Sequence, residues 1–295
     1  MGNGSGWNLK IIGDNLDMAI EEIGVESWEH FQDELRKLAD LRTRLVGEIG
    51  RTYVSNLLFR GQGGMSWKLS TTLERYTGVS LYSLDEYRKV TATVKSEIET
   101  FTDHTWEVAS LTQFANKSHE QQDHTTLLDL IGLEYMVYLR HHGFPSPLLD
   151  WTRSPYVASF FAFNTIPNDT THVSIYAYLE FTGKGKSFCT APPHILSIGP
   201  SKRTHKRHFL QQCEYTYCVC QTQDGIFFAN HADGFNFSER EDQDRLWKFN
   251  VPASERLTVL KILDSMNLNS FSLFLSEESL LEILALRKFY LDGYI

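Results

Sequence analysis

The sequence predicts an α+β fold in which helices cover a mixed β-sheet, with a helical segment at the N-terminus. Two stretches have the two-residue alternation of a strand, residues 173–180 and residues 213–220. Two others carry apolar residues at helical spacing, residues 14–49 and residues 126–143. Helices and strands in separate runs favour helices packed on a mixed sheet. With 42% apolar residues, the 295-residue chain can bury a sizeable core.

The first 50 residues are predicted to form a helical region, and residues 51–295 the main domain. Apolar residues recur at helical spacing from Asp14 to Ile49, and the acidic residues of "ESWEHFQDEL" suit the first turn of a helix. The stretch "NLLFRG", residues 56–61, then predicts a short strand that ends at glycine. The glycines of "GQGGMSW" after it predict a flexible loop.

The second half of the chain predicts one long helical region and then the main strands. From Ser83 to Leu139 the pattern is mostly helical, and the apolar stretch that follows residue 126 predicts a buried helix ended by Gly143. The stretches "THVSIYAYLEF" and "CEYTYCVC" predict strands, the second also from its β-branched and aromatic composition. From residue 257 on, a strand or short helix and then an amphipathic helix are expected.

Composition and charge exclude several classes of protein. A net charge of −9 argues against wholesale adsorption to nucleic acid or to an anionic membrane, although a local basic patch remains compatible with it. The chain has no apolar run of membrane-spanning length, and "MGNGSGWNLK" lacks the order of a secretory signal, so we expect a soluble cytoplasmic protein. The four cysteines lack zinc-site spacing and are interpreted as free thiols on or near a strand.

Three islands of sequence carry chemical signals, and the first is "LLFRGQ", residues 57–62. A half-buried guanidinium at the end of a buried strand is costly unless it is paired, and its planar fork suits a carboxylate or a phosphate. Arg60 therefore indicates an anionic partner, and the glycines around it would let backbone N–H groups approach that anion. An internal salt bridge to a carboxylate explains Arg60 equally well.

The second island runs from Arg140 to Phe163. Ser154 followed by a proline is typical of a helix N-cap and first turn, which accounts for that serine without any catalytic role. His141, His142 and Asp150 are conceivable metal ligands, but adjacent histidines at a helix end more often cap carbonyl groups or bond a neighbouring loop. We favour the second interpretation and expect no metal.

The third island, residues 201–220, combines positive charge with a polar strand face. Its basic residues are Lys202, Arg203, Lys206 and Arg207, which lie with two histidines. Gln212 and Glu214 follow two residues apart, so that on a strand both side chains leave the same face. That face is either a solvated surface or the wall of a cleft, and the well-packed opposite face from Cys213 to Val219 favours a cleft.

Together these islands resemble the bacterial and phage FRG-domain family. The resemblance is carried by "FRGQ", Trp67, "HHGFPSPLLDWTRSPYVASFFAF", "RHFLQQCEYT" and "WKFNVP", and it extends from about residue 57 to about residue 286. The chain departs from the usual family pattern at residues 140–143, where Q-H-x-G is common, and at residues 145–148, where P-T-R-L is common. Cys213 stands where a glycine is usual.

The same residues also resemble the arginine-serine-glutamate ADP-ribosyltransferases, which implies an ADP-ribosyltransferase-like fold and NAD as substrate. "DWTRSPYVASFFA" is similar to the second motif of those enzymes, Arg60 to the first-motif arginine, and Gln212 with Glu214 to the Q-x-E third motif. The resemblance implies that Arg60 holds the pyrophosphate, with Gln62 beside it. It also implies that Thr152 or Ser154 orients the ribose or Glu214.

A carboxylate at the ribose would stabilise the oxocarbenium-like state formed when the nicotinamide bond breaks. Glu214 is the expected catalytic residue, and Gln212 would bind the acceptor. The basic run would bind a nucleic-acid backbone, with RNA favoured over DNA or protein. NAD glycohydrolysis and a non-catalytic nucleotide- or nucleic-acid-binding module remain alternatives. The two resemblances also imply a toxin or phage-defence role and a neutralising partner.

Overall fold

The described residues form one mixed nine-stranded sheet, in which β1 runs parallel to β9 and the other paired strands are antiparallel. The computed structural model describes residues 20–109, 132–183, 193–198, 206–236 and 243–292. The strand order is β1-β9-β5-β2-β4-β7-β8-β3, and β6 pairs with β7. The strands are β1 Ile20–Gly24, β2 Leu57–Gln62, β3 Leu81–Ser83, β4 Leu149–Thr152, β5 His172–Phe181, β6 His194–Ile198, β7 Cys213–Thr222, β8 Gly225–Ala229 and β9 Gln243–Pro252.

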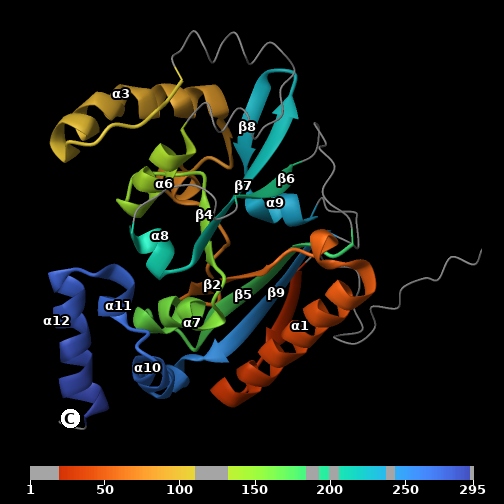
Figure 1. Cartoon of the computed structure of the whole chain (residues 1–295), viewed down its shortest axis with the longest axis vertical. Coiled ribbons are helices and arrows are strands. Elements are labelled where there is room, and N and C mark those ends of the chain that lie inside the picture. Colours follow the sequence, from red (N-terminus) through yellow and green to blue (C-terminus); the bar gives the residue numbers. More distant parts are fainter. Residues whose placement is uncertain (1–19, 110–131, 184–192, 199–205, 237–242, 293–295) are drawn as a thin grey trace, which may run out of the picture.

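Helices cover this sheet in two groups, one on each half (Figure 1). In one group α1, α7 and α10 pack with β5 and β9 around one apolar cluster. In the other group α3 and α6 pack with β7 and β8 around a second cluster. The α-helices are α1 Trp28–Ile49, α2 Thr72–Thr77, α3 Leu84–Thr102, α6 Leu133–His141, α7 Pro155–Asn164, α8 Lys206–Leu210, α9 His231–Asn236, α10 Arg256–Ser265, α11 Ser270–Phe274 and α12 Glu277–Leu286. The predicted α+β class, with helices on a mixed sheet, is confirmed.

The N-terminal segment differs from the sequence prediction, because it is not helical throughout. Residues 20–24 form β1, which pairs with residues 246–250 of β9, and of the described residues up to Gly50 only those of α1 are helical. The short pattern of isoleucine and glutamate in residues 20–24 is compatible with a helix or with a strand. Pairing with the edge of β9 makes this segment a strand. The apolar residues of α1, including Trp28 and Phe31, lie in the same cluster as those of α7 and β9. The predicted helical region 1–50 thus contributes, where it is described, to the sheet and core of the rest of the chain.

Most other predicted elements are confirmed. The strands predicted at 173–180 and 213–220 are β5 and β7, and Cys213, Cys218 and Cys220 are buried on β7 without a disulfide, while Cys189 lies outside the described residues. Helix α6 ends at His141, and Gly143 follows with φ 84°, a conformation that favours glycine. From residue 256 to residue 292 the structure has helices and no strand: α10, α11, α12 and a π-helical segment at Arg287–Leu291.

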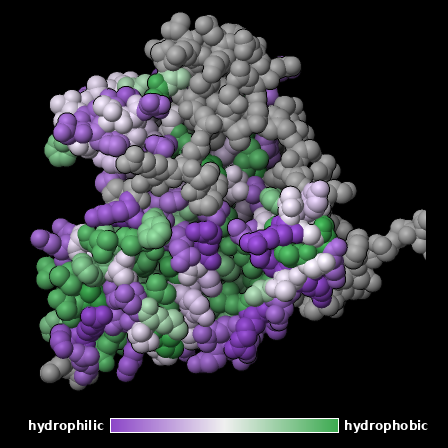
Figure 2. Space-filling model, in the orientation of Figure 1, coloured by the Kyte–Doolittle hydropathy of each residue, from purple (hydrophilic) through white to green (hydrophobic). Residues whose placement is uncertain are grey.

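Apolar side chains remain exposed on the C-terminal helices, as the green surface at the lower left of Figure 2 shows. Leu281 on α12 is 66% exposed, and Phe289 just after this helix is 55% exposed. No helix in the described ranges combines the length and the apolar character needed to cross a bilayer.

The contact between β2 and α7 explains why a glycine follows Arg60. A Cβ atom on Gly61 would collide with the carbonyl oxygen of Ala158 and would lie 2.6 Å from the backbone nitrogen of Ala162, both on α7. Gly61 therefore lies inside strand β2, which continues to Gln62 instead of ending at the glycine as predicted. Its missing side chain lets the backbone of α7 approach the strand.

We expect Gly61→Ala to destabilise the protein by about 1–3 kcal/mol or more, because the clash is with helix backbone that cannot rotate away. Chemical denaturation measures the change in the free energy of unfolding. Gly47→Ala on α1 is the matched control, because nothing lies within 4 Å of its Cβ position. Removing a glycine from a helix should stabilise by about 0.5–1 kcal/mol. Equal stability of Gly61→Ala and wild type would contradict the close-packing explanation.

Candidate functional site: a cationic cavity beside Arg60

Arg60 lies at the centre of the sheet with its guanidinium buried. Its Nη1 donates a hydrogen bond of 2.7 Å to the backbone oxygen of Asp150 on the neighbouring strand β4. Its Nε is buried and has no hydrogen-bond partner among the described residues. The pKa of Arg60 is lowered to about 10, chiefly by burial; Asp150 opposes this change, and the nearby Arg140 and Arg75 contribute to it. The guanidinium stays protonated at neutral pH.

The internal salt bridge that could have explained Arg60 does not form within the described part of the chain. The nearest acid, Asp150, pairs instead with Arg140, at 2.5 Å between Oδ2 and Nη2. The other carboxylate oxygen of Asp150, Oδ1, is buried without a hydrogen-bond partner in the described ranges. Arg60 thus retains donor capacity for a further partner.

A cavity of about 720 Å³ opens beside Arg60. It receives side chains from β2, β4, α6, α7, α8 and α11, which lie far apart in the sequence. Its charged lining residues are Arg60, Lys68, Arg75, Arg140, Arg207 and Asp150. Within the described part of the chain, five cations face one carboxylate here, although the whole chain has a net charge of −9. The cavity is therefore suited to an anion.

Three of the predicted NAD-binding residues line this cavity: Arg60, Gln62 and Thr152. Phe59 on β2 pairs with Thr152 on β4, so the two strands bring these residues together. Gln62 donates a long hydrogen bond of 3.4 Å to the backbone oxygen of Lys68, and its Oε1 is buried with no partner among the described residues. Gln62 and Thr152 thus offer polar atoms near Arg60.

The fourth predicted residue, Ser154, is the N-cap of α7. Its Oγ accepts a hydrogen bond of 3.3 Å from the backbone N–H of Val157, and Pro155 follows in the first turn. Ser154 is absent from the residues that line the cavity. The capping interpretation is confirmed, and Thr152 is the hydroxyl residue that reaches the cavity.

Glu214 lies on β7, directly opposite Trp151 of β4, with 6% of its surface exposed. Its Oε1 is 3.7 Å from Nε of Arg153 and has no hydrogen-bond partner among the described residues. Burial raises the pKa of Glu214, Arg153 lowers it and Glu180 raises it again. Cys213, the neighbour of Glu214, lines the cavity, whereas Glu214 does not. Successive strand residues point to opposite faces, which explains this difference.

Gln212 does not share a strand face with Glu214, and that prediction is wrong. Strand β7 begins one residue later, at Cys213, and Gln212 has φ 49°. Its N–H donates to the backbone oxygen of Phe209, as in a turn at the end of a helix, and its backbone oxygen accepts from the N–H of Arg153. Positive φ breaks the two-residue alternation, so Gln212 is exposed while Glu214 is buried.

The predicted acceptor-binding run is only partly within the described residues. Lys202 and Arg203 lie outside them, and Lys206 is exposed at the start of α8. Arg207 instead turns toward the cavity, where its guanidinium lies 5.4 Å from the ring centroid of Phe274. One member of the basic run thus adds to the charge of the cavity.

The adjacent histidines at the end of α6 face different surroundings. His141 lines the cationic cavity, and its Nε2 lies 2.7 Å from the hydroxyl of Tyr215, which also lies 3.2 Å from Nδ1 of His208. His142 lines a second cavity. Among the described residues, no group of three or more histidine, cysteine, aspartate or glutamate side chains is arranged to hold a metal.

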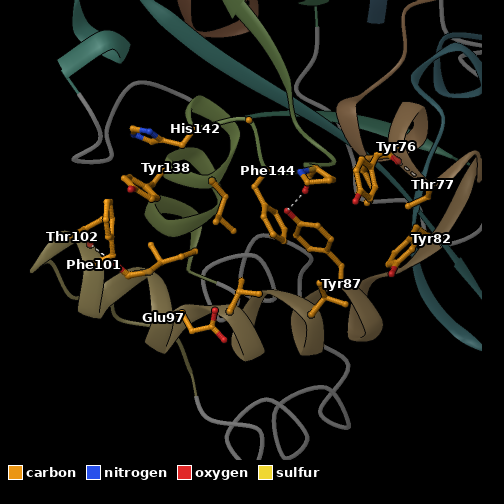
Figure 3. A pocket seen from close by; sticks show the side chains of 17 residues that line it. Tyr76, Thr77, Tyr82, Tyr87, Glu97, Phe101, Thr102, Tyr138, His142 and Phe144 are labelled. Atoms are coloured by element: carbon orange, nitrogen blue, oxygen red, sulfur yellow. Dashed lines mark hydrogen bonds between the residues drawn. The ribbon is translucent and has the colours of Figure 1, made fainter. Parts of the chain in front are cut away.

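The second cavity, of about 770 Å³, lies between α3 and α6 and is mainly apolar (Figure 3). Figure 3 shows Phe144 beside Tyr87, whose hydroxyl donates to the backbone oxygen of Pro145 at 3.0 Å. The charged residue of this second cavity, Glu97, is an acid, and its described lining residues include no lysine or arginine. This cavity is unsuited to a phosphate, so the candidate site is the cationic one.

Sequence reasoning missed three residues of the cationic cavity: Lys68, Arg75 and Arg140. Arg75 lies in the short helix α2 and Arg140 in the last turn of α6, where a basic residue is expected for helix stability alone. No local pattern distinguishes them from surface cations, because only the packing of α2 and α6 beside β2 and β4 brings them together.

Comparison with known proteins identifies one domain. Residues 55–171 match the model of the FRG domain. No curated protein and no solved structure matches the chain. The matched range contains β2, β4 and α7, and with them Arg60, Asp150 and Thr152, while Glu214 lies beyond it. Residues 55–171 of this protein are therefore an FRG domain.

Proposed function

We propose that this protein is an ADP-ribosyltransferase that binds NAD with its pyrophosphate in the cationic cavity. The observation that carries the proposal is the cavity itself, in which Arg60 keeps a buried, unpartnered Nε beside four further cations. A pyrophosphate carries two negative charges and accepts several hydrogen bonds, so it can neutralise the excess cations and accept a hydrogen bond from Arg60. Phe59 and Trp67 in the same lining offer apolar surface to the rest of a nucleotide.

The three proposed key residues come from three adjacent strands, which supports the finer assignment of an ADP-ribosyltransferase-like fold. Arg60 lies on β2, Thr152 on β4 and Glu214 on β7, and these strands are neighbours in that order. Thr152 pairs with Phe59 on one side and with Cys213 on the other. The proposal puts the ribose across the end of β4, between the cavity and Glu214.

In the proposed reaction the bond between C1′ of the ribose and the nicotinamide nitrogen breaks. Its electron pair leaves with nicotinamide, which becomes neutral, and positive charge develops on the ribose. The ionised carboxylate of Glu214 would stabilise that charge as it forms. A lone pair of the acceptor then bonds to C1′ and the acceptor loses a proton. Water in place of the acceptor would give the glycohydrolase reaction.

The acceptor is proposed to be nucleic acid, with RNA favoured, bound by the basic run at residues 202–207. Lys206 is exposed and available for such contacts. A toxin or defence role with a neutralising partner is part of the same proposal and has its support in the resemblances alone.

A non-catalytic nucleotide-binding module is the second candidate, and one observation favours it. Glu214 lies outside the lining of the cavity that would hold the phosphates, and its nearest cation is Arg153. In this alternative the cationic cavity binds a nucleotide and no bond is broken.

One assay separates these functions: incubation of the purified protein with NAD, with and without cellular RNA. Nicotinamide release with ADP-ribose on RNA supports the transferase. Release with free ADP-ribose as product indicates glycohydrolysis. Binding of NAD without nicotinamide release indicates the binding module.

The pH dependence of nicotinamide release tests the role of Glu214. Burial raises the pKa of this carboxyl above the ordinary 4.5, so activity should fall with decreasing pH at a higher pH than for an exposed glutamate. Arg153 lowers that pKa, so Arg153→Gln should shift the loss of activity to still higher pH. Arg36→Gln on α1, paired with Asp33 at the surface, is the control for net charge. If Arg153→Gln does not shift the pH dependence of nicotinamide release, Glu214 is not the titrating group.

A further inference from the structure

Three arginines of the cationic cavity repel one another. Arg140 and Arg75 both lower the pKa of Arg60, and Arg140 also lowers the pKa of Arg75, in each case after the larger effect of burial. All three line the same cavity, where charges of like sign lie near one another. The three side chains come from β2, α2 and α6.

A single carboxylate within the cavity compensates this cluster. Asp150 pairs with Arg140 through Oδ2, and its backbone oxygen accepts the bond from Arg60. Glu74 also attracts Arg75, but it is engaged at the N-cap of α2 and lies outside the cavity lining. Three guanidinium groups against one carboxylate leave an excess of two positive charges, before Lys68 and Arg207 are counted.

The cluster also keeps unused donors on two different arginines. Nε of Arg60 and Nε of Arg140 are both buried and have no hydrogen-bond partner among the described residues. A buried donor without a partner costs free energy, and on a charged group the cost is larger. Donors from two different guanidinium groups suit an anion with two linked phosphate groups better than a single small anion.

We infer that Arg60, Arg75 and Arg140 form a binding site for two linked phosphates, as in a nucleoside diphosphate, and that Asp150 competes with this ligand for Arg140. The inference rests on the proposed assignment of Arg60 to a phosphate and adds Arg75 and Arg140 as phosphate-binding residues. Asp150 holds Arg140 while the cavity lacks an anion, and its negative charge opposes the bound phosphates. Its removal should therefore tighten binding.

Isothermal titration calorimetry with inorganic pyrophosphate, inorganic phosphate and ADP tests this inference on the whole chain. Pyrophosphate should bind at least about tenfold more tightly than phosphate, because it engages more charge-assisted hydrogen bonds. Arg75→Gln and Arg140→Gln should each weaken pyrophosphate binding by about tenfold or more. Asp150→Asn should strengthen it by about threefold or more, in line with the loss of a nearby like charge. Arg36→Gln, with the same change of charge on α1, should leave the affinity unchanged.

Folding of each variant is checked by circular dichroism. Arg140→Gln leaves Asp150 without its ion pair, so the double variant Arg140→Gln/Asp150→Asn replaces it if the single variant unfolds. Arg75 is exposed, so its variant should fold. Equal affinities for phosphate and pyrophosphate would overturn the two-phosphate site. Unchanged pyrophosphate affinity in folded Arg75→Gln and in the Arg140 variant would overturn the role of these arginines, and weaker binding by Asp150→Asn would overturn the competition.

This experiment uses no NAD cleavage, so its outcome is separable from that of the proposed function. Pyrophosphate binding with the expected variant effects, together with a lack of nicotinamide release, would leave the site in place and refute the transferase. Nicotinamide release with pyrophosphate binding unaffected by Arg75 and Arg140 would refute the inference alone.

Discussion

Glu214→Gln should reduce nicotinamide release from NAD by about 10²- to 10³-fold or more, the size of effect seen when one preorganised electrostatic group is removed from a transition state. Glutamine has nearly the same shape but no charge, so the developing charge on the ribose loses its partner. The residue is buried and its Oε1 accepts no hydrogen bond from the described residues, so the change should leave the fold intact. The measurement is the steady-state rate of nicotinamide release at saturating NAD.

Glu134→Gln is the matched control for this change, because Glu134 is an exposed glutamate in the first turn of α6. Its activity should equal that of the wild type. NAD affinity of Glu214→Gln should change less than its rate, since the phosphates bind elsewhere. Full activity in a folded Glu214→Gln protein would refute the catalytic assignment and leave the binding module as the better account.

Arg60→Lys should weaken NAD binding by about tenfold to a hundredfold. Lysine keeps the positive charge but has no planar fork, so it can bond the carbonyl of Asp150 or a phosphate but cannot present two parallel donors. Lost charge-assisted hydrogen bonds are each worth about 1.5–3 kcal/mol. Calorimetric titration with NAD measures the affinity, and thermal unfolding shows whether the variant stays folded.

Arg42→Lys provides the comparison for Arg60→Lys. Arg42 on α1 also donates to a backbone oxygen, that of Ser55, and lies outside the lining of the cavity. It should lose stability to a similar degree and keep the affinity for NAD. If Arg60→Lys lowers the unfolding temperature but the folded protein binds NAD as before, the role of Arg60 is structural.

Local sequence patterns determined much of the secondary structure. The alternation in β5 and β7, the serine-proline start of α7 and the glycine after α6 are features of near neighbours in the chain, and each element forms where its pattern predicts it. Arg60 could also be singled out, because a charged residue at the end of a buried strand stands out against its own neighbours. The FRG motif around it was sufficient to identify the domain.

The tertiary structure decided the points that depend on distant residues. Residues 20–24 form a strand because β9, more than 200 positions later, offers its edge. Gln212 leaves the strand because the end of α8 sets its φ, so it does not lie beside Glu214 on one face of β7.

The composition of the cationic cavity is where the sequence prediction and the structure differ most. The sequence indicated Arg60, Gln62 and Thr152 by their place near a strand end. Arg75 and Arg140 lie in the last turns of helices, where a basic residue is expected for helix stability alone. Charge convergence is a property of how α2, α6 and α8 pack around β2 and β4, not of any one segment. Periodicity reports which face of an element is buried, because burial repeats along the chain, whereas the composition of a cavity depends on contacts between segments that no repeat connects.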